Sequence, residues 1–108
     1  MTDARIALTT FDSLDQAKHF SRYIVERRFA ACVNLVENVH SVYRWKEKVE
    51  SVPEILAIIK TTVERIDTLK DALTVLHPYQ VPEFIVLEIE EGGTSYLSWL
   101  LSASRDLE

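Results

Sequence analysis

Residues 53–60 read PEILAIIK, and the five apolar side chains inside this stretch decide the fold class of the 108-residue chain. Successive side chains of a β-strand point to opposite faces of its sheet, so a strand with one wet face alternates apolar and polar residues. Positions 55–59 are all apolar, so apolar side chains would point to both faces of the sheet. This pattern predicts a strand that is buried on both faces.

The sequence on either side predicts a ferredoxin-like arrangement around this strand. Ser13 with Gln16, and later Thr61 with Glu64, have the spacing of capping boxes, and Thr94 is placed to cap a last helix. We therefore expect four strands, at 5–10, 31–45 (in two segments, 31–36 and 39–45), 55–60 and 84–89. We expect helices after Ser13, over 63–76 and after Thr94. The order β-α-β-β-α-β plus a C-terminal helix is that of an α+β fold, the ferredoxin-like split βαβ sandwich.

The second face of the predicted sheet indicates an oligomer. Two helices cover one face only, and several hundred Å² of apolar surface is costly to leave in water at ~25 cal/mol per Å². In so short a chain the simplest cover is another copy of itself. The strands at 31–45, with a bulge expected between Asn34 and Asn38, form one arm of a long hairpin. Tyr43 and Trp45 share one face of this arm, and we interpret them as interface anchors rather than base-stacking residues.

Composition and charge narrow the class of protein. The chain has 47% hydrophobic residues, and we expect residues 1–108 to form a single domain with a proper core. A formal net charge of −5 disfavours nucleic acid and anionic membranes as partners. No stretch approaches the ~20 apolar residues of a membrane span. One cysteine, Cys32, leaves no internal disulfide, and a cytoplasmic location is expected.

Three side chains are candidates for chemistry, and each has a structural alternative. His77 precedes Pro78 in a segment that prolines make rigid and extended, so it is either a presented ligand or a residue that hydrogen-bonds a carbonyl. Cys32 is either a ligand or a small buried hydrophobe. Glu83, beside Pro82, contacts either a ligand or solvent and backbone. No nucleophile elbow, Walker loop or GxGxxG motif is present, so we do not expect an enzyme.

Five separated motifs resemble those of one family. The sequences AACVN (30–34), SVYRW (41–45), IIKTT (58–62), LHPYQVPE (76–83) and YLSWL (96–100) occur in the order found in the CutA family of divalent-cation-tolerance proteins. The resemblance extends from about residue 6 to residue 101. It implies a PII-like homotrimer of ferredoxin-like subunits, with hairpins that pair across subunits. It also implies a role in tolerance to copper and other divalent cations.

The resemblance leaves two functions open. Where family members carry the proposed copper ligands, this chain has Leu8 and Leu76-His77, so only His77 is retained. The first function is weak binding of Cu(II) or another divalent cation by His77, with Cys32 or Glu83 of the same or a neighbouring subunit as a second ligand. The alternative is a regulatory module that binds a small anionic ligand or a partner protein in the intersubunit clefts. That alternative uses Lys60, Tyr79 and Glu83.

Overall fold

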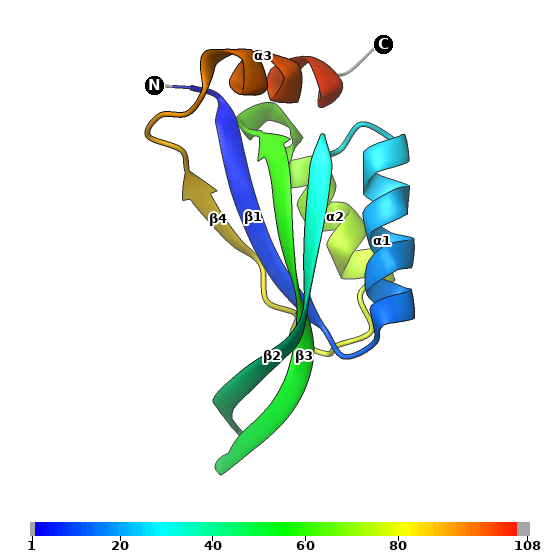
Figure 1. Cartoon of the computed structure of the whole chain (residues 1–108). Helices are drawn as coiled ribbons and strands as arrows, with labels where there is room; N and C mark the ends of the chain where they lie inside the picture. The colour runs from blue at the N-terminus through cyan, green and yellow to red at the C-terminus, as the bar shows by residue number, and fades with distance from the viewer. Residues whose placement is uncertain (1, 106–108) are drawn as a thin grey trace.

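The computed structural model describes residues 2–105, which form one four-stranded sheet with helices against it (Figure 1). The elements in chain order are β1 (Ala4–Phe11), α1 (Leu14–Glu26), β2 (Cys32–Trp45), β3 (Lys48–Thr62), a short 3₁₀ helix (Val63–Arg65), α2 (Ile66–Leu76), β4 (Ile85–Glu88) and α3 (Thr94–Ala103). The strand order is β2-β3-β1-β4, with every pair antiparallel. This is the predicted ferredoxin-like α+β fold. Within residues 2–105, no helix is both long and apolar enough to cross a membrane.

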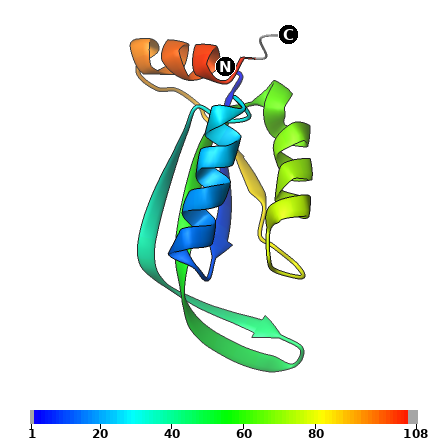
Figure 2. The same cartoon turned by 90° about the vertical axis from the view of Figure 1, so that its right-hand side faces the viewer.

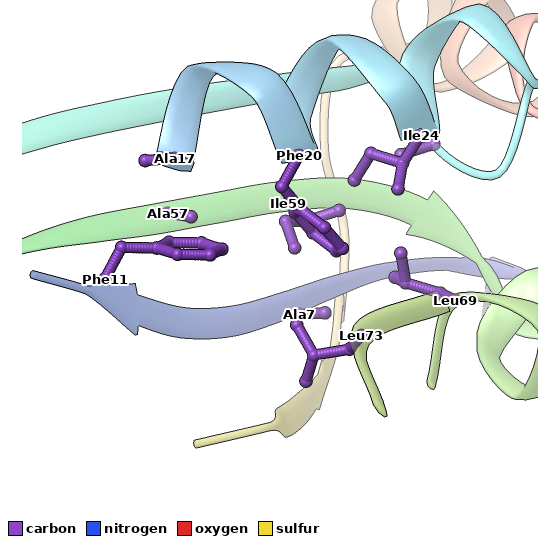
Figure 3. Packing of buried hydrophobic residues seen from close by; sticks show 10 residues of the cluster. Ala7, Phe11, Ala17, Phe20, Ile24, Ala57, Ile59, Leu69 and Leu73 are labelled. Atoms are coloured by element: carbon purple, nitrogen blue, oxygen red, sulfur yellow. The ribbon is translucent and has the colours of Figure 1, made fainter. Parts of the chain in front are cut away.

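One face of the sheet carries the main core. Helices α1 and α2 lie side by side on this face, while α3 crosses the end of the sheet where β1 begins (Figures 1 and 2). Phe11 of β1, Phe20 of α1 and Leu73 of α2 are almost fully buried together. Figure 3 shows the core side chains of the two helices meeting those of the sheet, including Ala57 and Ile59 of β3.

The opposite face of the sheet is apolar and only partly covered. On β3, Ala57 and Ile59 are fully buried in the main core, whereas Leu56 and Ile58 alternate with them and are half-buried on the other face. The strand is therefore apolar on both faces, as the sequence predicts. At one end of this face Leu100 of α3 packs on Ala4. We call the rest the open face; it carries Leu8, Val36, Leu56, Ile58, Ile85 and Leu87.

The hairpin of β2 and β3 extends beyond the helices at one end of the molecule (Figures 1 and 2). Its register shifts between Val36 and Val39, where Asn38 has a φ of 60°, so the predicted bulge is present. The turn is formed by Lys46 and Glu47, which have φ angles of 48° and 68°. This outer half of the hairpin therefore has almost no cover from its own chain.

Local predictions of helix starts were right at one position and wrong at two. Ser13 caps α1 and accepts a hydrogen bond from the Gln16 N–H at 3.3 Å. Thr61 does not cap the second helix, because it is still in β3 and its hydroxyl donates to the Phe29 carbonyl at 2.7 Å. Thr94 is the first residue of α3 rather than its cap. The last strand is also shorter than predicted, since β4 covers Ile85–Glu88 only.

Candidate functional site

His77 lies at the C-terminal end of α2 and uses both of its ring nitrogens. It leaves the helix with an extended backbone (φ −78°, ψ 134°), as expected for a residue before proline. Its Nε2 lies 2.7 Å from the Thr10 carbonyl oxygen, and its Nδ1 lies 3.1 Å from the Tyr79 backbone nitrogen. A carbonyl only accepts and a backbone N–H only donates, so the ring is neutral with its proton on Nε2. Neither nitrogen is left free for a metal ion.

The surroundings of His77 favour this neutral form. The side chain is 8% exposed, and its ring stacks on Phe11 with a centroid distance of 4.4 Å. Burial lowers the pKa of His77 from 6.5, and this effect outweighs the opposing ones of the Thr10 carbonyl and of the negative charges of Asp12 and Glu54. The imidazole is therefore held in place as a structural group.

Tyr79 extends this arrangement to the central strand. Its ring packs edge-on against His77 with a centroid distance of 4.6 Å, and its hydroxyl donates to Glu54 Oε2 at 2.6 Å. Burial, and then the bond to Glu54 and its charge, raise the pKa of Tyr79 above its usual value, so the hydroxyl keeps its proton. The three side chains His77, Tyr79 and Glu54 thus connect the α2–β4 segment to β1 and β3. We call them the His77–Tyr79–Glu54 chain.

A pocket of about 730 Å³ lies beside this chain, at the base of the hairpin. We call it the hairpin pocket. Its walls come from the end of β1, from β2 and β3 of the hairpin, and from residues 79–83, so it brings together the predicted ligand residues Tyr79 and Glu83. Its volume is in the range typical of small-molecule sites. Trp45 and Tyr43, predicted as interface anchors, also line it.

The other predicted site residues, Lys60 and Cys32, lie elsewhere. They are register partners on neighbouring strands, and the Lys60 ammonium donates to the Asn34 side-chain oxygen. Lys60 also pairs with Ile6 on β1, four residues from Thr10, which corresponds to about 13 Å along the strand. His77 and Cys32 are therefore not brought together in one subunit. Among residues 2–105, no three His, Cys, Asp or Glu side chains are grouped so as to hold a metal ion.

Glu54 and Asp12 were not predicted to belong to the site. Glu54 is 7% exposed and forms the end of the His77–Tyr79–Glu54 chain, and Asp12 follows β1 at the rim of the pocket. A signal for Glu54 was available, because it is a lone carboxylate between Pro53 and the doubly buried run 55–59. Carboxylates are rarely buried without a specific partner.

Known proteins resemble this chain over nearly its whole length. The model of the CutA1 divalent ion tolerance protein family matches residues 5–103. The divalent-cation tolerance protein CutA of Thermus thermophilus is 42% identical over 95 residues, covering 88% of this chain and 92% of that protein. Human protein CutA is 42% identical over 94 residues, 87% of this chain, which spans only 52% of the human protein. The structure of the PII-like protein CutA from Nostoc sp. PCC 7120 in apo form superposes with a TM-score of 0.86 at 34% identity, covering 94% of this chain and 97% of that one. The chain belongs to the CutA1 divalent ion tolerance protein family.

Proposed function

We propose that the protein is a PII-like homotrimer that contributes to divalent-cation tolerance as a binding module, without enzymatic activity, and that the hairpin pocket is its ligand site. The observation that carries this proposal is the use of both His77 ring nitrogens within the fold, next to a pocket bordered by Tyr79 and Glu83. In this proposal His77 holds the pocket wall in place and is not the primary metal ligand.

The trimer is supported by the open face. Ile85 is 48% exposed and Leu87 is 45% exposed on the edge strand β4, beside the half-buried Leu8 and Ile58. A contiguous apolar face of this kind usually marks an interface. Sedimentation at micromolar concentration is expected to give a trimer. A stable, folded monomer at that concentration would contradict the proposal.

The ligand site is tested by filling the pocket with a larger side chain. Val81 is 65% exposed and lines the hairpin pocket, whereas Val75 is 79% exposed on α2 and does not. A thermal-shift screen of metal ions, nucleotides, small acids and amines is expected to find a ligand that stabilises the native trimer. The shift should be lost in Val81→Trp and retained in Val75→Trp. A shift that both variants retain would place the ligand elsewhere.

Weak binding of Cu(II) or another divalent cation is a second candidate function, favoured by the family and by the affinity of imidazole for copper. Binding at His77 Nδ1 would break the bond from the Tyr79 N–H. Cys32 would have to come from a different subunit. Calorimetry is therefore expected to give weak Cu(II) binding, and a sub-micromolar, stoichiometric site lost in His77→Ala would establish this candidate instead.

The alternative ligand is a small anion bound by Lys60, Tyr79 and Glu83. Because Lys60 lies outside the pocket of its own chain, this mode needs Lys60 from a neighbouring subunit. We also propose a cytoplasmic location, which the free thiol of Cys32 supports.

A further inference from the structure

The charged side chains of the hairpin pocket all have the same sign. Asp12, Glu54 and Glu83 line it, and no Lys, Arg or His is among the residues of the described chain that do. None of the three carboxylates has an ion-pair partner within residues 2–105, where the recorded salt bridge joins Arg22 to Glu26. The pocket therefore offers negative charge that its own chain does not neutralise.

Glu54 is the most enclosed of the three carboxylates. Glu54 is 7% exposed, and its Oε2 accepts a hydrogen bond from the Tyr79 hydroxyl. Within residues 2–105, no group donates a hydrogen bond to its Oε1. Tyr79 supplies a hydrogen bond but no positive charge. An ammonium group bound in the pocket would supply the positive charge that Tyr79 does not.

The remaining walls of the pocket suit an organic cation. Trp45 and Tyr43 are 38% and 42% exposed, and Val42, Val52 and Val81 add aliphatic surface. An ammonium group is attracted to the face of an aromatic ring, as illustrated by the Lys46 ammonium 5.7 Å from the centre of the Trp45 ring. Methylene groups would be buried against the valines.

The length of the pocket indicates an extended ligand. Trp45 and Glu54 line opposite ends of the pocket. Trp45 pairs with Lys48, and Lys48 is six residues from Glu54 along β3, so the two ends are about 20 Å apart along the strand. The carboxylates are also too dispersed to surround one metal ion, since residues 2–105 contain no three-residue group of that kind. A flexible chain with several separated positive charges fits both observations.

We propose that the hairpin pocket binds an extended aliphatic polyamine. Its ammonium groups pair with Glu54 and Glu83, and its methylene chain lies along the hairpin towards Trp45. This inference rests on the proposed function, because it names the ligand class of the same pocket. It differs from the anionic ligand considered above in the sign of the charge that is recognised.

Binding is measured with spermidine, using the fluorescence of Trp45 in the full-length trimer. Trp99→Phe removes the other tryptophan, which lies on α3 outside the pocket. Two comparison probes test the chemistry: tricarballylate reverses the charge, and 1,8-octanediol keeps an aliphatic chain without charge. Spermidine is expected to bind saturably and to dissociate at high salt, because the ion pairs are screened. Tricarballylate and 1,8-octanediol are expected to give no response.

Matched variants separate a specific site from general attraction to an acidic protein. Glu83→Gln removes one pocket charge and is expected to raise the Kd for spermidine about tenfold, as for the loss of a charged hydrogen bond. Glu64→Gln removes the same net charge from an exposed position on the 3₁₀ helix and should leave the Kd within about twofold. Equal effects of the two variants would overturn the inference.

The other outcomes distinguish this inference from the proposed function. If tricarballylate or 1,8-octanediol binds at Trp45 and spermidine does not, the binding module stands and the cationic ligand is wrong. If no probe binds and Glu83→Gln instead weakens the trimer, the carboxylates pair with the basic hairpin tip of a neighbouring copy, and the inference fails. If no ligand of any class binds in the thermal-shift screen, both proposals fail.

Discussion

Replacing His77 tests whether the histidine is structural. Its two hydrogen bonds, to Thr10 at 2.7 Å and from Tyr79 at 3.1 Å, contribute about 1 kcal/mol each. Its stacking on Phe11 contributes about 0.5–1.5 kcal/mol more. His77→Ala should therefore lower the free energy of unfolding by about 3 kcal/mol. His77→Phe keeps an aromatic ring against Phe11 and should cost about 2 kcal/mol, because only the hydrogen bonds are lost.

The assay is equilibrium unfolding in urea at one fixed protein concentration, since the stability of an oligomer depends on concentration. His19→Ala is the control, because His19 is exposed on α1, and it should change the free energy of unfolding by less than about 0.5 kcal/mol. The structural role would be refuted if His77→Ala were as mild as His19→Ala. Loss of a stoichiometric Cu(II) site in that same variant would show His77 to be a ligand.

Three further predictions concern pH, the pocket wall and assembly. The folded state lowers the pKa of His77 below 6.5, so the unfolded chain binds more protons once the pH falls below 6.5. The free energy of unfolding should therefore fall as the pH falls through 6.5, and His77 should contribute no pH dependence above it. Urea unfolding at several pH values will check this, and His77→Phe should lose part of the slope. Tyr79→Phe removes the 2.6 Å bond to Glu54 and should cost about 1–2 kcal/mol in the same assay; no change would mean that water replaces the hydroxyl fully. Ile58→Asp should dissociate the trimer in sedimentation, while the circular dichroism spectrum remains that of a folded subunit. Val63→Asp, on the 3₁₀ helix, should leave the trimer assembled. An intact Ile58→Asp trimer would place the interface elsewhere.

The element order could be predicted from the sequence because its signals are local. The doubly apolar run 55–59 and the Ser13 cap depend on residues next to each other in the chain, and both are present in the structure. The cap at Thr61 was wrong for a tertiary reason. Its hydroxyl bonds to Phe29, which is 32 residues away, and the strand continues through the expected helix start.

The candidate site was harder to predict because it depends on strand register and distant contacts. Tyr79 and Glu83 lie near each other in sequence, and they share a pocket. Lys60 was grouped with them, but it is six residues from Glu54 on the same strand and pairs with Cys32 at the other end of the sheet. The partner of Glu54 is Tyr79, 25 residues away, and no local pattern indicates that contact.

The hairpin turn has a consequence for the order of folding. Lys46 and Glu47 both have positive φ angles, which cost energy for residues other than glycine, asparagine or aspartate. A turn that is unfavourable by itself is a poor nucleus, and the bulge between Val36 and Val39 separates it from the base of the hairpin. We expect the two arms to pair from the helix-covered base outwards, with the tip closing after the folding transition state. Mutations at the tip should then speed unfolding and leave the folding rate almost unchanged, whereas mutations at Ala57 or Ile59 should slow folding.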